Sequence, residues 1–512
     1  MLDVVGRNPL FAGLAPAELE ELAGAMQMRS FEANEVICRA GDPGDSLFLV
    51  TGGFARVELE ERIVARLRRG DVIGEMSLVT GEPRTATVVA AVPATALELS
   101  RDDIGTVIAK QPRILENLTR ILSDRLAATT ARVADSRARG EAVALVVGEA
   151  AAKCVPEILA ATEAASPRAV ASIDVRSSLD PLERLDDLLA QNGTVVIVVD
   201  STQDGVPLLV AAADRTETVE EEPPDVAWLG RHLARTKLGL ALGAGGAKGY
   251  AHVGALQVLE DAGYTVDFVS GSSIGAMVGA WIALGLDAAE IDATMREAFR
   301  SETIDEIFKL SMSGGSTGLD AMTRLLRETT RDKTFADLVL PLVVMTVDLN
   351  AQAPAPVTEG PLWEALLAAT ALAGMFPPHE QDGKRLVDGL ALVPVPTDAV
   401  AEAGADVTVA VNIISRQTLP AWPGEVPEAV PSRGARSRML DTLLEVMDLA
   451  QLDSSERHAA RADVPVTPRF GPGSWRDFHL ADLFLEAGRQ AAEEQLPALR
   501  SLARPQPSTV TN

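Results

Sequence analysis

A serine between two glycines in the C-terminal half of the chain could act as a nucleophile. Gly271, Ser273 and Gly275 match the pattern G-x-S-x-G, and an apolar, β-branched run at 266–269 precedes them. In that arrangement a serine lies on a sharp strand-to-helix turn, where glycines leave room for the backbone. The N-terminus of the following helix offers N–H groups to developing negative charge. The pattern therefore predicts a catalytic Ser273, with a chemically silent glycine–serine turn as the alternative.

A second glycine-rich turn precedes this serine by one strand–turn–helix unit. Residues 236–242 form an apolar run typical of a buried strand, and Gly243, Gly245 and Gly246 follow it. Such a turn can hold an anion through its backbone N–H groups. A dinucleotide-binding fingerprint is the alternative, but the next strand ends in the G-x-S-x-G serine and not in a ribose-binding carboxylate. Two glycine turns on successive units favour an oxyanion hole beside a nucleophile.

The N-terminal segment carries a different set of candidate ligands. Short strand patterns alternate there with Gly/Asp turns, which predicts a small β-roll or barrel. Glu75 precedes a short helix expected at 76–79, and Arg84 follows it. The helix N-terminus presents N–H groups to an anionic phosphate, and Arg84 can add charge-assisted hydrogen bonds to it. Glu75 could hold a sugar hydroxyl.

This stretch resembles the phosphate-binding cassette of cyclic-nucleotide-binding domains. The resemblance implies that Glu75 holds the ribose 2′-hydroxyl, that Arg84 holds the cyclic phosphate, and that the ligand is cyclic AMP or cyclic GMP. The implied nucleotide site consists of Gly74, Glu75, Met76, Ser77, Arg84 and Thr85. A roll that has kept its shape and lost its ligand is the alternative.

The pair Asp388-Gly389 follows the two glycine turns, and the three motifs in this order resemble the patatin-like phospholipase family over about residues 236–415. With the N-terminal segment ahead of them, they resemble the neuropathy target esterase group and its bacterial relatives. The resemblance implies an α/β hydrolase domain with a mostly parallel central sheet, in which Ser273 is the nucleophile and Asp388 its partner. It also implies activity on phospholipids or lysophospholipids, with no metal and no cofactor for catalysis.

The same resemblance places the oxyanion hole in the first glycine turn. Its members would be Gly243, Gly245 and Gly246, with Lys248 close by. The chain departs from the family's usual sequence just after Asp388. The family usually has another small residue after its Asp-Gly and later an asparagine, where this chain has Leu390 and the Val-Pro pair at 393–394. We expect this departure to affect local geometry and not the chemistry.

Two routes are open for the proton of Ser273. His458 and His479 follow Asp388 in the chain, and the order Ser, Asp, His matches an α/β-hydrolase triad. However, Asp388 directly precedes a glycine at an expected strand end, as the base of a dyad would. A buried carboxylate with a raised pKa can take the serine proton directly. The sequence favours the Ser273–Asp388 dyad and keeps the triad as the alternative.

Four parts are expected along the chain, which gives a multidomain fold class. They are a β-roll with flanking helices (1–135), a small α/β connecting domain (136–230), the catalytic core (231–415), and C-terminal helices with a tail (416–512). In the connecting part, apolar runs predict strands at 143–147, 169–173, 194–199 and 206–210. The acidic run at 217–224 predicts a solvated linker.

Composition excludes some classes of partner. A net charge of −27 argues against nucleic acid, and it confines any membrane contact to a local apolar patch. The two cysteines, Cys38 and Cys154, cannot form a disulfide framework and are expected to be reduced. There is neither a signal-peptide pattern nor an apolar run of membrane-spanning length. We expect a cytoplasmic protein that contacts the inner face of the membrane peripherally, and a homodimer is compatible with the sequence.

These expectations combine into a serine esterase of the phospholipase type whose activity cyclic nucleotide regulates. The competing class is a cyclic-nucleotide sensor whose hydrolase domain is an inactive scaffold. The presence of Ser273, Asp388 and the glycine turn in one chain argues against the scaffold.

Overall fold

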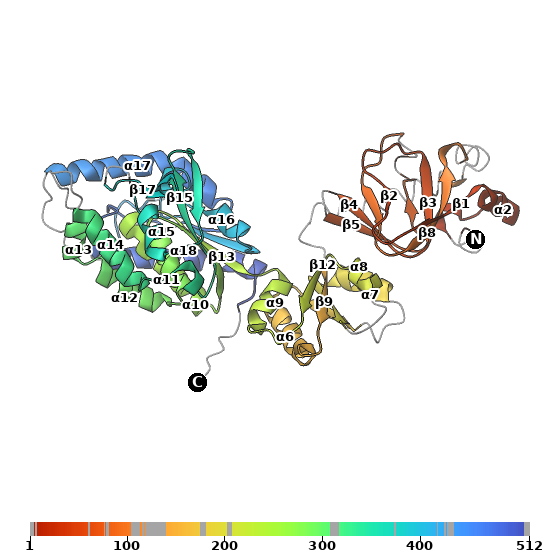
Figure 1. Cartoon of the computed structure of the whole chain (residues 1–512), viewed down its shortest axis with the longest axis horizontal. Helices are drawn as coiled ribbons and strands as arrows, with labels where there is room; N and C mark the ends of the chain where they lie inside the picture. The colour runs from red at the N-terminus through yellow and green to blue at the C-terminus, as the bar shows by residue number, and fades with distance from the viewer. Residues whose placement is uncertain are drawn as a thin grey trace. The chain divides into compact units, whose positions relative to one another are not determined.

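In the computed structural model, the chain forms two compact units, which we describe separately (Figure 1). Unit 1 comprises Met1–Ala160 and Arg168–Val226, and unit 2 comprises Ala161–Pro167 and Ala227–Asn512. The structure describes residues 5, 8–59, 62–75, 77, 81–103, 113–114, 117, 140–174, 181–201, 207–307, 317–372, 375–416, 418–423, 426–427 and 435–505. The helix expected at 76–79 lies largely outside these residues.

The N-terminal part of unit 1 is a β-roll of two antiparallel sheets, as expected. One sheet has the order β1 (Gln27–Phe31), β8 (Ala94–Ser100), β3 (Ser46–Gly52), β6 (Val72–Ile73), and the other the order β2 (Val36–Cys38), β7 (Thr87–Ala90), β4 (Ala55–Leu59), β5 (Arg62–Leu67). Both faces of β3 are buried, because successive side chains of a strand point to opposite sides. Phe48 and Val50 pack with the second sheet, whereas Leu47 and Leu49 pack with Leu22 of α2 (Pro16–Ala25).

The rest of unit 1 is a four-stranded parallel sheet with flanking helices. Its order is β10 (Val170–Asp174), β11 (Thr194–Asp200), β9 (Glu141–Val147), β12 (Arg215–Val219), and its helices are α7 (Pro181–Gln191), α8 (Pro207–Ala212) and the first part of α6 (Val155–Ala165), whose last residues belong to unit 2. The strand expected at 206–210 is wrong, because Pro207–Ala212 form α8. A short apolar run does not distinguish strand from helix, and Pro207 favours a helix start. The linker expected at 217–224 is also wrong in part, since its first residues belong to β12.

An eight-stranded mixed sheet organises the described part of unit 2. Its order is β17 (His379–Gln381), β18 (Lys384–Asp388), β15 (Leu342–Asp348), β14 (Val266–Ser272), β13 (Leu238–Leu242), β19 (Val407–Val411), β20 (Val464–Val466), with β16 (Ala353–Val357) also paired to β15. The run from β15 to β20 is parallel, and β16, β17 and β18 are antiparallel to their neighbours. The expected mostly parallel central sheet is confirmed in this run.

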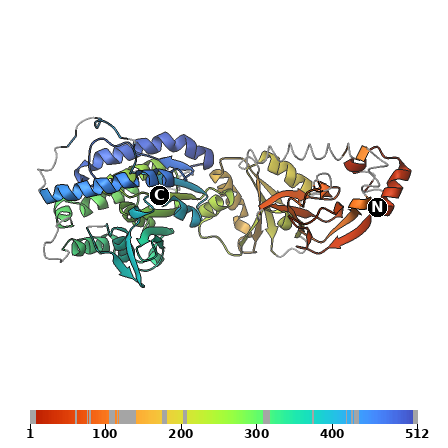
Figure 2. The ribbon, with the colours of Figure 1, turned by 90° about the horizontal axis from the view of Figure 1, so that it is seen from above.

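Helices cover both faces of this sheet (Figures 1 and 2). The described helices from residue 226 onward are α9 (Val226–Ala234), α10 (Tyr250–Asp261), α11 (Ile274–Ala283), α12 (Ala288–Ala298), α13 (Ser301–Ile307), α14 (Thr317–Thr330), α15 (Leu362–Ala369), α16 (Thr397–Glu402), α17 (Ala435–Ala459) and α18 (Ala481–Leu502). Leu240 of β13 packs in one core with α10, α11 and α18, whereas its neighbour Ala241 packs in another with Val400 of α16 and Ala459 of α17. The uninterrupted apolar run of β13 follows from burial on both faces.

None of the helices within the described residues is long and apolar enough to cross a membrane.

Candidate active site

The G-x-S-x-G pattern forms a tight turn between β14 and α11. Ser273 caps the helix in a left-handed conformation, with φ 55° and ψ −125°. A Cβ atom on Gly271 would lie 2.3 Å from the carbonyl oxygen of Gly275, and one on Gly275 would lie 2.2 Å from that of Leu242. The flanking positions therefore accept only glycine. The conformation of Ser273 costs a non-glycine residue roughly 1–3 kcal/mol in stability. Such strained residues cluster at functional sites, which makes Ser273 a functional candidate.

Ser273 and Asp388 are hydrogen-bonded directly. The Ser273 hydroxyl donates to Asp388 Oδ2 at 2.6 Å, and the N–H of Leu390 donates to the other carboxylate oxygen at 2.8 Å. Three adjacent strands bring the pair together: Ser272 of β14 lies opposite Met345 of β15, whose next residue Thr346 lies opposite Asp388 of β18.

Burial sets the acidity of this carboxylate. Asp388 is only 3% exposed, whereas Ser273 is half-buried and can meet a substrate. Loss of hydration raises the pKa of Asp388 from its usual 3.8 to about 7, against the opposing effect of the hydrogen bonds from Ser273 and Leu390. A carboxylate with such a pKa can both accept and return a proton near neutral pH.

The glycine turn after β13 lies against the serine turn. Leu242, the last residue of β13, is the partner of Gly271 on β14. Two N–H groups of the turn are already bonded, Gly243 to the carbonyl of Val411 and Ala244 to that of Pro394. Within the described residues, the N–H groups of Gly245 and Gly246 have no hydrogen-bond acceptor. These two donors are suited to an oxyanion.

The second set of candidate residues gathers in the β-roll around Arg84. Its guanidinium is buried and donates to the carbonyl of Gly74 at 3.1 Å and to that of Ser46 at 2.6 Å. Its Nε is also buried and has no partner within the described residues. A Cβ atom on Gly74 would lie 1.8 Å from Arg84 Nη1, so glycine is required for this approach. A buried arginine with a spare donor can receive an anionic group.

The other expected nucleotide ligands are placed unevenly. Glu75 and Ser77 are buried beside Gly74, and the Ser77 hydroxyl donates to the carbonyl of Pro83 at 3.3 Å. Thr85 is exposed. Met76 lies outside the described residues.

Two family models match separate parts of the chain. A family model described as patatin-like phospholipase matches residues 240–401, which include Ser273 and Asp388. The chain carries a patatin-like phospholipase domain. A model of the cyclic nucleotide-binding domain matches residues 28–111, which include Glu75 and Arg84. The resemblance seen in the sequence is thereby confirmed, and the chain is a lipid ester hydrolase with a cyclic nucleotide-binding domain ahead of the patatin-like domain.

Three similar proteins match different shares of the chain. An uncharacterized NTE family protein of Mycobacterium tuberculosis is 27% identical and aligns over 97% of this chain and 96% of the relative. Patatin-like phospholipase domain-containing protein 6 of Mus musculus is 34% identical over 38% of this chain and 14% of its own length. A crystal structure of Thermus thermophilus catabolite activator protein is 34% identical over 25% of this chain and 62% of that chain, with a TM-score of 0.23.

His252 supports the glycine turn of the patatin-like domain, and the sequence did not assign it this role. It lies one turn after the glycines on α10, is fully buried, and donates from Nε2 to the carbonyl of Gly243 at 2.8 Å. The Nε2–H tautomer follows because a carbonyl can only accept. Burial lowers the pKa of His252 to about 4, so the ring is neutral at pH 7. The sequence feature that could have indicated this role is the short separation between His252 and the glycine turn along the chain.

The segment after Asp388 also supports both turns. The carbonyl of Val393 accepts from Ser272, and that of Pro394 accepts from Ala244 of the glycine turn. The side chain of Leu390 is buried against Ala244, where the family usually has a small residue. The residues that differ from the usual family sequence, Leu390 and the Val-Pro pair at 393–394, thus add packing next to the dyad. They leave the hydrogen bond between Ser273 and Asp388 in place.

Unit 2 also contains three other candidate residues, Lys248, His458 and His479. The Lys248 ammonium is 4.0 Å from Asp448 of α17 and 5.7 Å from the centre of the Phe470 ring. His458 bonds within α17 to the carbonyl of Ser454 at 2.7 Å. Neither His458 nor His479 has a hydrogen bond to Ser273 or Asp388 within the described residues.

An apolar cluster borders the dyad, and only the tertiary structure assembles it. The buried side chains of Ala244, Leu372, Leu390 and Ile414 form its centre, and partly buried side chains pack around them: Met375, Met447, Leu452 and Trp475. Methionine side chains adapt to irregular apolar shapes, as an acyl chain requires.

Across the residues that the structure describes, no group of three or more His, Cys, Asp or Glu side chains is placed to hold a metal ion.

Proposed function

We propose that this chain hydrolyses the carboxylic ester bonds of phospholipids, with lysophospholipids as the preferred class, through a Ser273–Asp388 dyad. The observation that carries the proposal is the 2.6 Å hydrogen bond from the Ser273 hydroxyl to a buried carboxylate whose pKa is raised to about 7. No histidine stands between the two side chains in this bond, which favours the dyad over the triad.

In the first half of the reaction, Ser273 Oγ attacks the ester carbonyl carbon while its proton passes to Asp388. The carbonyl oxygen becomes an oxyanion and accepts hydrogen bonds from the N–H groups of Gly245 and Gly246. When this intermediate collapses, the ester C–O bond breaks, and Asp388 returns the proton to the departing alcohol oxygen. The acyl group remains on Ser273.

In the second half, water replaces the alcohol. Asp388 takes a proton from the water as its oxygen attacks the acyl carbon, and the same two N–H groups hold the second oxyanion. The bond to Ser273 Oγ then breaks, Ser273 recovers its proton from Asp388, and the fatty acid leaves.

The preference for a single acyl chain rests on the apolar cluster around Ala244 and Leu390. Its flanking side chains, which include Met375, Met447 and Trp475, are partly buried and can enclose a chain beside the dyad. Because such substrates reside in lipid aggregates, the proposal includes a cytoplasmic enzyme that contacts the inner face of the membrane peripherally.

Hydrolysis of lysophosphatidylcholine and of a short-chain chromogenic ester tests the proposal. We expect the wild type to hydrolyse both and Ser273→Ala to hydrolyse neither, with an unchanged melting temperature. A fluorophosphonate probe should label the wild type stoichiometrically at Ser273, and Asp388→Asn should not be labelled. Absence of turnover and of labelling in a folded wild type would support the alternative, a sensor with an inactive hydrolase domain.

The proposal gives the β-roll a regulatory role. In this proposal, residues 1–135 bind cyclic AMP or cyclic GMP, residues 231–512 form the hydrolase, and residues 136–230 connect these two parts. The Nε of Arg84 is buried and has no partner within the described residues, which favours a phosphate ligand, and in the proposal the buried Glu75 holds the ribose. Within unit 1, Arg66 of β5 donates to Asp214 at 2.5 Å and could transmit a change in the roll to the parallel sheet.

Ester turnover with and without saturating nucleotide tests the regulation. We expect nucleotide to raise turnover in the wild type and to leave Arg84→Ala unchanged, because coupling requires that the ligand favour one arrangement of the protein. Equal turnover in all four conditions, together with measured nucleotide binding, would contradict regulation and leave the hydrolase assignment intact.

A further inference from the structure

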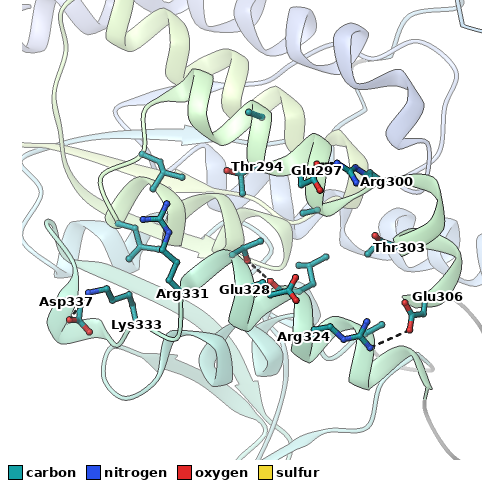
Figure 3. A pocket seen from close by; sticks show the side chains of 17 residues that line it. Thr294, Glu297, Arg300, Thr303, Glu306, Arg324, Glu328, Arg331, Lys333 and Asp337 are labelled. Atoms are coloured by element: carbon teal, nitrogen blue, oxygen red, sulfur yellow. Dashed lines mark hydrogen bonds and ion pairs between the residues drawn. The ribbon is translucent and has the colours of Figure 1, made fainter.

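A cavity of about 710 Å³ opens among the helices of unit 2, at a distance from the dyad (Figure 3). Residues of α12, α13, α14 and the turn after α14 line it, together with Leu284 at the end of α11. Ser273 precedes α11, whose ten residues rise by about 15 Å. The cavity and the dyad therefore lie at opposite ends of the nucleophile helix.

Aliphatic side chains form one part of the lining. They are Leu284, Leu286, Ala293, Ala298, Ala321 and Leu325. Of these, Ala298, Ala321 and Leu325 are buried, and the two leucines at 284 and 286 are partly buried. The cavity has the volume of a small-molecule site and an apolar surface that a hydrocarbon chain can cover.

Charged side chains form the other part, and they balance. Four are acidic (Glu297, Glu306, Glu328, Asp337) and four are basic (Arg300, Arg324, Arg331, Lys333). Three pairs form among them: Arg300 with Glu297, Arg324 with Glu306 at 3.6 Å, and Lys333 with Asp337 at 3.4 Å. Within the described residues, the side chains of Glu328 and Arg331 form no ion pair, so one negative and one positive charge face the cavity together.

The backbone at Arg331 is unusual for an arginine. Its φ is 54°, its N–H donates to the carbonyl of Glu328 at 3.2 Å, and the N–H of Asp332 donates to that of Arg327 at 3.1 Å. This pattern ends a helix with a left-handed residue, a position that glycine usually occupies. An arginine there is less favourable for stability than a glycine, so its replacement by glycine should not destabilise the turn.

We propose that this cavity is a second lipid site, which binds a single-chain zwitterionic amphiphile of the lysophospholipid type. The chain lies on the aliphatic lining, the phosphate accepts from the guanidinium of Arg331, and the ammonium group lies beside the carboxylate of Glu328. A net neutral lining that leaves one charge of each sign complements a headgroup with one charge of each sign. A singly charged amphiphile would leave one of the two side chains without a partner.

Binding of dodecylphosphocholine below its micelle concentration tests this site. The full chain with Ser273→Ala is titrated by calorimetry and compared with the same protein carrying Arg331→Gly. We expect Arg331→Gly to weaken binding at least tenfold while the melting temperature stays equal or rises. Glu328→Gln should weaken binding as well, and neither change should alter the affinity for dodecyl maltoside, which has an uncharged headgroup.

The chain offers a matched control in Arg235. This residue also has a left-handed φ of 56°, and it ends α9 with the same two backbone hydrogen bonds, from Arg235 to His232 and from Thr236 to Arg231. Arg235→Gly should leave dodecylphosphocholine binding unchanged. Equal affinity in the parent and Arg331→Gly, or absence of binding to the parent, would overturn the proposal. Because the probe is not an ester and the nucleophile is removed, failure here does not bear on the hydrolase assignment.

Discussion

Ser273 Oγ lies 2.6 Å from Asp388 Oδ2 although 115 positions separate the two residues in the chain. The pairing of β14 with β15 and of β15 with β18 produces this contact, because it brings one strand end next to the other. The two side chains share a single proton in the proposed reaction, so they should behave as one unit when they are replaced.

Replacement of either dyad residue should remove nearly all turnover. We expect Ser273→Ala and Asp388→Asn each to lower kcat by roughly 10³–10⁴-fold, and the double variant to be no worse than either single one, because both act in the same step. Steady-state kinetics on a short-chain ester measure this, with melting curves as the control for folding. Additive losses, or a comparable loss from His458→Ala or His479→Ala, would contradict the dyad.

The acidity of Asp388 predicts a pH profile. As a general base it must be ionised, so kcat/KM should rise with a slope of one and level off above its pKa of about 7. The profile is measured on a substrate whose own ionisation does not change between pH 5 and 9. A plateau that extends down to pH 5 would contradict a buried base with a raised pKa.

The same shift predicts a stability difference for Asp388→Asn. A carboxyl whose folded pKa is raised above its usual 3.8 stabilises the protein fully below about pH 4, and this contribution is lost as pH rises through about 7. The variant cannot ionise, so it should gain stability relative to the wild type between pH 4 and 8, by up to a few kcal/mol. Chemical denaturation of both proteins at pH 4 and 8 measures the change. A difference that does not depend on pH would contradict the shift.

His252 should act by positioning the glycine turn. His252→Leu removes the donor to the Gly243 carbonyl, so we expect a loss in kcat of roughly tenfold or more, a nearly unchanged KM, and a loss of about 1–3 kcal/mol in stability. His252→Gln can donate from a similar position and should recover most of kcat. If His252→Leu and His252→Gln had the same kcat, the donated hydrogen bond would not matter for turnover, and His252 would act only through packing.

The nucleotide site can be tested through Gly74. A methyl group on Gly74 would displace the Arg84 guanidinium, so Gly74→Ala should weaken cyclic nucleotide binding as Arg84→Ala does, by roughly ten- to a hundredfold. Gly81→Ala is the matched control, because Gly81 has a similar φ of 75° and no atom within 4 Å of the added group. Calorimetry with cyclic AMP and cyclic GMP measures both variants. If Gly74→Ala bound cyclic nucleotide as tightly as the wild type, the result would contradict a contact between Arg84 and the ligand.

The sequence by itself determined the β-roll, the order of the domains and the two glycine turns, because each is encoded in local spacing: a glycine turn after a buried strand has few alternatives. Local pattern did not distinguish strand from helix at residues 206–210, where neighbours decide the outcome of a short apolar run. Only the tertiary structure decided the contact of Ser273 with Asp388, the support of Gly243 by His252, and the cavity at Arg331. Each of these depends on which strands and helices become neighbours, and the free energy of burial that selects those neighbours is spread over the whole core.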